Sequence, residues 1–211
     1  NRKYIPKCED CNVVIITLTN IGAKPLGIYG YERNTSPNID EFAKNSIVFA
    51  NAFSQISWSL PAVASLFTSK YTFTHGLMSR NVLDESEETL AEILRIYGYK
   101  TVAFTGGGDY RKKYGIAQGF NIFDDNDKST IFTGSFNRSI NAAIDWLRMN
   151  KDKNFFLFLQ GYDAHCPFNP PDEYKYLFEK DYTGVVNDSF CIRSVDFKHV
   201  ESDQGIELFT A

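Results

Sequence analysis

The sequence predicts an α/β fold in which a mainly parallel sheet is flanked by helices. Short runs of apolar and β-branched residues recur along the chain, which is typical of strands buried on both faces of a parallel sheet. Segments whose apolar residues lie at helical spacing separate these runs. Strands that alternate with helices favour parallel pairing through right-handed crossovers.

The first half of the chain holds two strand candidates and two helix candidates. Residues 12–18 read Asn-Val-Val-Ile-Ile-Thr-Leu and predict the first core strand. A Ser-Pro-Asn turn at residues 36–38 precedes a helix that we expect over residues 39–45. Residues 47–53 form the second strand candidate, and residues 61–68 a short helix.

The second half repeats this alternation. Residues 87–97 predict a helix and residues 100–104 a strand. After a glycine-rich, charged connection over residues 106–128, an amphipathic helix is expected at residues 136–150 and a buried strand at residues 154–160. Functional groups of open α/β sheets gather at the carboxyl ends of the strands, so the loops after the predicted strands are the places to search.

Composition bounds the possible functions. At 211 residues, 43% hydrophobic and 23% charged, the chain is expected to form a single α/β domain over residues 1–211. We expect this domain to be incomplete at its C-terminus, because residues 181–211 show no clean period. A net charge of −4 argues against nucleic acid as a partner. No stretch reaches the roughly 18 apolar residues of a membrane span. Compartment and oligomeric state are not predicted.

Cysteine usage leaves several interpretations open. Cys8, Cys11, Cys166 and Cys191 are enough for two disulfides. The Cys8–Cys11 pair also has the spacing of half a zinc site, although a second pair at matching spacing is missing. Ordinary thiols are the third interpretation.

A series of collinear segments gives the sequence its family resemblance. The matching segments are residues 12–30, 34–43, 49–55, 58–68, 74–76, 98–104 and 163–171. Their order and spacing resemble the N-terminal part of sulfatases of the alkaline phosphatase superfamily. The resemblance covers about residues 12–177, and the collinearity of the segments is what makes it specific. It implies an alkaline phosphatase-like fold and hydrolysis of sulfuric or related phosphoric esters.

The resemblance assigns the nucleophile to Ser59. In that family the nucleophile lies in a C/S-x-P-x-R motif and is oxidised to formylglycine. Ser59 to Val63 aligns with the motif, with valine at the arginine position. The start of a helix suits this chemistry, because unpaired N–H groups and the positive end of the dipole favour an anion there. The alternative is that Ser59 only caps the helix.

Two further residues match positions that hold the transferred group in the family. His165 matches a histidine that contacts this group, and Lys70 matches a basic position after the nucleophile helix. The alternative for His165 is a loop histidine that bonds to backbone. Asp163 could orient His165 or cap the loop. A Gly-Gly-Gly run at residues 106–108 replaces a lysine and a histidine that the family usually carries there.

The resemblance also implies a divalent cation, calcium, as cofactor. The family's metal site begins with two acidic residues directly after the first strand, where this sequence has Thr19 and Asn20. Neutral oxygens can ligate calcium, but without the family's two acidic side chains little negative charge is left to hold the ion. Weak or absent calcium affinity is therefore expected. The remaining acidic ligands of the family come from a later strand, beyond the end of this chain.

Two functions follow from these assignments. The first is a hydrolase acting on a small-molecule or glycan sulfate ester through Ser59, with no turnover expected from the 211-residue chain alone. The second is a non-catalytic sulfatase-like module with an anion- or glycan-binding cleft, which Thr19, Asn20 and Val63 favour. A purely structural fragment is a third possibility.

Overall fold

The computed structural model describes residues 11–125, 136–165 and 170–178. The chain divides into two compact units, residues 1–165 and 166–211. In the second unit the described part contains the short helix α6 (Asp172–Lys175). A single domain over residues 1–211 stays a prediction.

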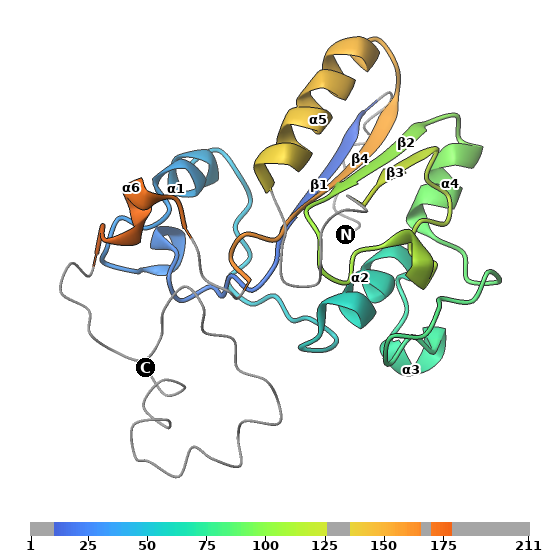
Figure 1. The fold of residues 1–211 in the computed structure, drawn as a ribbon, viewed down its shortest axis with the longest axis horizontal. Helices are drawn as coiled ribbons and strands as arrows, with labels where there is room; N and C mark the ends of the chain where they lie inside the picture. The colour runs from blue at the N-terminus through green and yellow to red at the C-terminus, as the bar shows by residue number, and fades with distance from the viewer. Residues whose placement is uncertain (1–10, 126–135, 166–169, 179–211) are drawn as a thin grey trace, which may run out of the picture. The chain divides into compact units, whose positions relative to one another are not determined.

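A parallel sheet forms the centre of the first unit (Figure 1). Its four strands lie in the order β1-β4-β2-β3, and every pairing is parallel. They are β1 (Val13–Leu18), β2 (Lys100–Thr105), β3 (Ile122–Asp124) and β4 (Phe155–Gly161). β4 is buried along its whole length, as expected of a central strand covered on both faces. The predicted α/β fold with a parallel sheet is confirmed.

Helices cover the two faces of this sheet (Figure 1). α5 (Phe136–Asn150) packs Ala143 and Trp146 on one face. The other face carries α2 (Ser59–Thr68) and α4 (Leu90–Ile96). Phe67 of α2 meets Phe158 of β4 edge to face, with ring centroids 4.9 Å apart. Burying such a side chain stabilises the fold by roughly 1.5–3 kcal/mol, so this contact helps to hold α2 against the sheet.

Short helices occupy the connections of the first unit. They are η1 (Gly27–Tyr29), α1 (Pro37–Ala43), α3 (Thr72–His75) and η2 (Lys112–Tyr114). α1 confirms the helix expected after the Ser-Pro-Asn turn, with Ser36 as its N-cap residue.

Two strand assignments differ from the sequence prediction. Residues 47–53 are not a strand, and Ile47 and Phe53 are 84% and 86% exposed. Their β-branched and aromatic composition is insufficient, because a strand also needs a neighbour to pair with. β3 was not expected, because three residues are too few to show a period. It is held beside β2 by Asn121, whose backbone and side chain both bond to Thr101.

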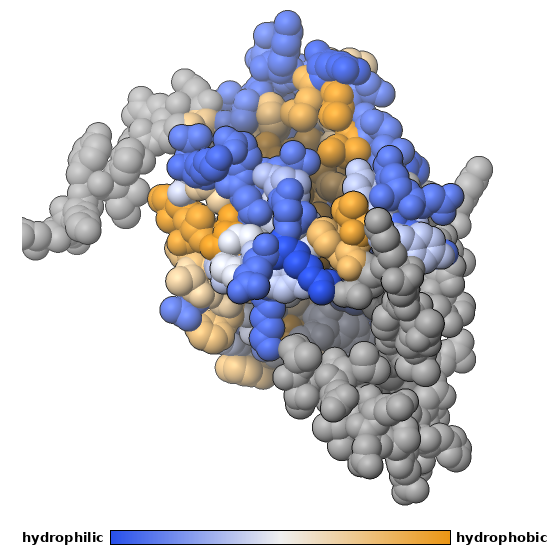
Figure 2. All heavy atoms as spheres, turned by 90° about the vertical axis from the view of Figure 1, so that its left-hand side faces the viewer, coloured by the Kyte–Doolittle hydropathy of each residue, from blue (hydrophilic) through white to orange (hydrophobic). Residues whose placement is uncertain are grey.

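One apolar strip of the sheet is uncovered. Val14, Ile16 and Leu18 of β1 are 49%, 58% and 39% exposed. They share a face with Leu157 and Leu159 of β4, which pack under α5, but α5 lies over β4 and β2. Figure 2, seen from the left-hand side of Figure 1, shows exposed apolar side chains in its upper part.

Candidate active site

The carboxyl ends of β1, β4 and β2 lie next to one another at one edge of the sheet. Polar residues or glycines follow each of them. Thr19 and Asn20 follow β1, and His165 comes four residues after β4 ends. The glycine run at residues 106–108 follows β2. This is the edge at which open parallel sheets bind ligands.

Ser59 is the first residue of α2, and the preceding Trp58 is its N-cap residue. The Ser59 side chain is half-buried, and its hydroxyl bonds to no other residue in the described part of the chain. Pro61 has no N–H, and the N–H of Ala62 already donates to the Trp58 carbonyl at 3.1 Å. The N–H groups of Ser59 and Leu60 in the first turn therefore have no acceptor among the described residues. Ser59 is at position N1, directly after the N-cap residue.

Trp58 ties the start of α2 to the loop after β2. Its indole Nε1 donates to Asp109 Oδ2 at 3.2 Å. Arg80 Nε donates to the other oxygen, Asp109 Oδ1, at 3.1 Å. Since Asp109 directly follows the glycine run, this shared carboxyl group holds the N-terminus of α2 at the carboxyl end of β2.

The glycine run makes room for Tyr162, which follows β4. Gly108 has φ +70°, and a Cβ there would lie 2.4 Å from the Tyr162 ring. Burial, together with the negative charge of Asp109, raises the pKa of Tyr162 to about 12, so its hydroxyl stays protonated. His165 stacks on this ring, with centroids 4.5 Å apart. Trp58, which precedes Ser59, is thus bonded to Asp109. The neighbouring Gly108 lies against Tyr162, on which His165 stacks.

Asp163 has a different contact. Its Oδ2 accepts a hydrogen bond of 2.6 Å from the backbone N–H of Phe136, the first residue of α5. A carboxylate at a helix N-terminus satisfies an unpaired donor and interacts favourably with the helix dipole. Asp163 therefore anchors α5 to the loop that carries His165.

Thr19 lies in a buried, neutral hydrogen-bond network. Its Oγ1 accepts from Gln160 Nε2 at 2.7 Å, and Gln160 Oε1 accepts from the N–H of Gly106 at 2.8 Å. Gln160 is fully buried, so this network joins the ends of β1, β4 and β2. Tyr110 lies against it; burial raises its pKa to about 12 although a hydrogen bond with Thr19 acts in the opposite direction. Asn20 is exposed, with φ +63°.

These residues do not fit a divalent cation. Calcium in proteins takes about six to eight oxygen ligands, among them carboxylates that supply the negative charge. Over residues 11–125, 136–165 and 170–178, no three His, Cys, Asp or Glu side chains form a group that could hold a metal ion. Asp109 is bonded to Trp58 and Arg80, and Asp163 to the start of α5. The oxygen of Thr19 is engaged by Gln160.

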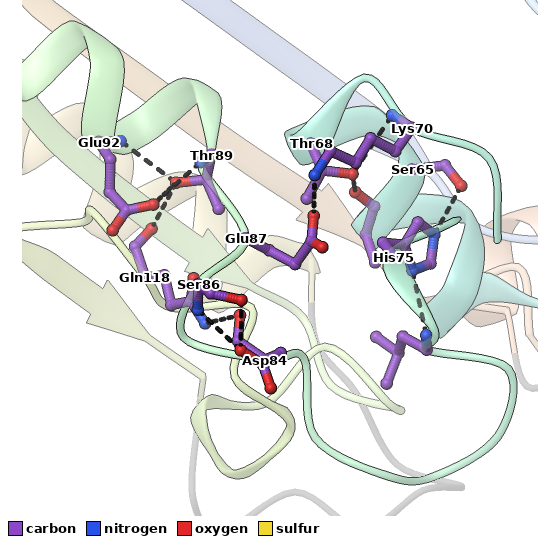
Figure 3. A network of polar contacts seen from close by, with 12 residues as sticks. Ser65, Thr68, Lys70, His75, Asp84, Ser86, Glu87, Thr89, Glu92 and Gln118 are labelled. Carbon is purple, nitrogen blue, oxygen red and sulfur yellow. Dashed lines mark hydrogen bonds and ion pairs between the residues drawn. The ribbon is translucent and has the colours of Figure 1, made fainter. Parts of the chain in front are cut away.

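Lys70 is not brought to this edge. It lies beyond the C-terminal end of α2, and its Nζ is 2.7 Å from Glu87 Oε2 (Figure 3). With a rise of about 1.5 Å per residue, the helix separates Lys70 from Ser59 by roughly 15 Å. A pocket of about 370 Å³ lies at this end, lined by Gln55, Ser65, Leu66, Ser69, Lys70 and Tyr71.

A hydrogen-bonded serine–histidine pair lies near the same end of α2 (Figure 3). Ser65 Oγ is 2.9 Å from His75 Nε2, and the N–H of Leu77 donates to His75 Nδ1 at 3.1 Å. Because Nδ1 accepts, Nε2 carries the proton and donates to Ser65. A base that activates a serine must accept its proton, so this pair is structural. Burial lowers the pKa of His75, against the opposing charge of Glu87.

Sequence reasoning missed Arg80, Asp109, Tyr162 and Gln160. Asp109 had one signal, its place directly after a glycine run at a strand end. Arg80 had none, because it lies 29 positions from Asp109 in an irregular loop.

Two other expectations concern cysteine and the membrane. Cys11 is in a disulfide, so its sulfur is not a zinc ligand. The other three cysteines lie outside the described residues. Among the helices that the structure describes, none is long and apolar enough to cross a membrane.

Comparisons with known proteins agree with this architecture. The family model for Sulfatase matches residues 11–208. Arylsulfatase A of Bos taurus is 33% identical over 97 residues, which cover 43% of this chain and 19% of that protein.

Solved structures show the same fold. One is a protein in complex with its substrate D-glucosamine-2-N,6-O-disulfate (TM-score 0.69, 18% identity, 81% of this chain and 38% of that one). Another is a protein of the alkaline phosphatase superfamily from Vibrio parahaemolyticus (TM-score 0.63, 21% identity, 84% of this chain and 46% of that one). The predicted alkaline phosphatase-like fold is confirmed, and the chain spans less than half the length of each protein.

Proposed function

Because the chain belongs to the sulfatase family, we propose that the whole protein of which it is part hydrolyses sulfuric or related phosphoric esters with Ser59 as nucleophile. The observation that carries this proposal is the position of Ser59. Its half-buried hydroxyl bonds to no described residue and stands in the first turn of α2, beside two N–H groups that no described residue accepts.

The first turn of α2 suits the charge of the proposed substrate. Open N–H groups and the positive end of the helix dipole attract a sulfate or phosphate ester. His165, stacked on Tyr162 at the same edge of the sheet, is the proposed side-chain contact of the transferred group. Lys70 has no part in this proposal, since it is paired with Glu87 at the other end of α2.

The proposed nucleophile is the unmodified serine, because Val63 is buried in the core where the family has arginine. The Ser59 oxygen forms a bond to sulfur, and the bond from sulfur to the alcohol oxygen breaks. The hydroxyl proton ends on the departing alcohol. Water then attacks sulfur, the bond from sulfur to Ser59 breaks, and sulfate leaves as the serine is restored.

The test is sulfate release from p-nitrophenyl sulfate by the whole gene product. Ser59→Ala is expected to lower kcat at least about a thousand-fold, as removal of a nucleophile does. Ser65→Ala is the matched control, since Ser65 is a buried serine of the same helix outside the proposed site. Activity of Ser59→Ala at the wild-type level would refute the nucleophile assignment.

A non-catalytic, anion-binding module is the second candidate function. The neutral network of Thr19 and Gln160 favours it, because it stands at the position of the family's acidic metal ligands. Calorimetry of the whole protein with calcium, magnesium and manganese separates the two candidates. Micromolar binding would count against the module, whereas absent binding together with absent turnover would support it.

A further inference from the structure

The positive charge near the start of α2 comes from Arg80, which the sequence analysis did not identify. Val63 is in the core, and Lys70 is at the far end of the helix. Arg80 is joined to the N-cap residue Trp58 through the carboxyl group of Asp109. No motif of the sequence pointed to this arginine.

The geometry presents the guanidinium and not the carboxylate to solvent. The Asp109 side chain is 11% exposed, whereas that of Arg80 is 52% exposed. Arg80 uses only Nε for Asp109, so its terminal nitrogens bond to no described residue. Arg111 lies on the same loop, with its Nε donating to the Gly108 carbonyl at 3.1 Å. Arg80 thus presents an exposed positive charge beside the nearly buried Asp109.

Resting on the proposed function, we propose that Arg80 binds a second anionic group of the substrate, carried by the alcohol part of the ester. One carboxyl group and the Trp58 indole lie between the guanidinium and the first turn of α2. The ester at Ser59 and the group at Arg80 are therefore different groups of one molecule. An alcohol with a further sulfate, such as a multiply sulfated sugar, has this chemistry.

Arginine is suited to this role. Its planar guanidinium presents paired donors that match a sulfate or carboxylate, and the nearly buried Asp109 fixes its orientation. Because the site is half exposed, salt screens the interaction, and the expected effect on binding is about fivefold.

The experiment measures binding to the whole protein carrying Ser59→Ala, so that no substrate is consumed. Calorimetry compares D-glucosamine-2-N,6-O-disulfate with D-glucosamine-6-O-sulfate at low and high salt. Adding Arg80→Gln is expected to weaken binding of the disulfate about fivefold at low salt, with a change below about twofold for the monosulfate. Arg80→Lys keeps the charge without the planar donors and should fall in between.

Arg95→Gln is the matched control, because Arg95 is an exposed arginine of α4 outside the Arg80–Asp109 pair, and it should change neither affinity. Equal affinity of the Ser59→Ala protein for both sugars, or an equal loss in Arg80→Gln, would overturn the proposal. The hydrolysis assay tests the proposed function separately. Absent hydrolysis of p-nitrophenyl sulfate by the wild-type protein would refute that function.

Discussion

His75 is a buried side chain whose charge state is fixed by its hydrogen bonds. The Leu77 N–H and Ser65 hydroxyl occupy both ring nitrogens of the neutral form. Burial lowers its pKa below the usual 6.5, so the unfolded chain binds the proton more readily than the folded one. The contribution of His75 to stability is complete above pH 6.5 and declines as the pH falls below that value.

The free energy of unfolding should therefore depend on His75 at acidic pH. Urea unfolding between pH 8 and pH 5 is expected to show a smaller loss of stability in His75→Gln than in the wild type below pH 6.5. Identical slopes for the two proteins in this range would show that His75 titrates alike in the folded and unfolded chains.

Gly108 is the residue that lets Tyr162 lie against the glycine run. Gly108→Ala combines a positive φ with a clash at the ring, and we expect a loss of about 1–3 kcal/mol in unfolding free energy. Gly98→Ala is the control, because Gly98 has φ +87° and a Cβ added there would meet nothing within 4 Å. Equal losses in the two variants would mean that the ring contact contributes nothing.

Single positions were predictable where the information is local. The apolar pattern predicted a helix over residues 61–68, and the family resemblance placed Ser59 at its start. The helix begins at Ser59. The bonds of Asp109 to Trp58 and Arg80 join residues 51 and 29 positions apart, through side chains of irregular segments. No local pattern encodes such contacts, because they depend on how the loops are placed by the sheet.

α4 shows how an element boundary is set. Thr89 accepts from the Glu92 N–H at 3.2 Å, and Glu92 accepts from the Thr89 N–H at 2.9 Å, which makes a reciprocal capping box. The helix expected over residues 87–97 begins at Leu90 for this reason. The Thr-x-x-Glu pattern was present in the sequence and marks the boundary.

Thr89→Ala should lower the unfolding free energy by about 1–2 kcal/mol, because it leaves the Glu92 N–H without its acceptor and removes a bond to the Gln118 carbonyl. Thr89→Ser keeps the hydroxyl and should lose much less. Thermal and urea unfolding give the comparison; similar losses in both variants would mean that the methyl group, not the cap, is what matters.

At the scale of the molecule, the sheet of this chain has one uncovered apolar strip. Val14 and Ile16 of the edge strand β1 are about half exposed, beside the part of the sheet that α5 covers. Contiguous exposed apolar side chains on an edge strand favour association between molecules. The fold class was predictable because strand and helix periods repeat over the whole chain, whereas this strip depends on which strands α5 reaches.

The 211-residue chain is accordingly expected to self-associate, and Val14→Thr with Ile16→Thr should shift it toward the monomer. Sedimentation velocity over a range of concentrations measures this, with Ile96→Thr on the exposed side of α4 as the control. A wild-type chain that stays monomeric at every concentration would contradict the expectation.

The central claim is that Ser59 carries the transferred group, and mass spectrometry tests it most directly. The whole protein is quenched during turnover of p-nitrophenyl sulfate and digested, and the peptide with Ser59 is measured. We predict that this peptide gains the mass of one SO₃ group, and that Ser59→Ala abolishes the gain. An unmodified Ser59 peptide during turnover with the group on another residue, or a peptide lighter by two hydrogens through conversion to formylglycine, would contradict attack by the serine hydroxyl.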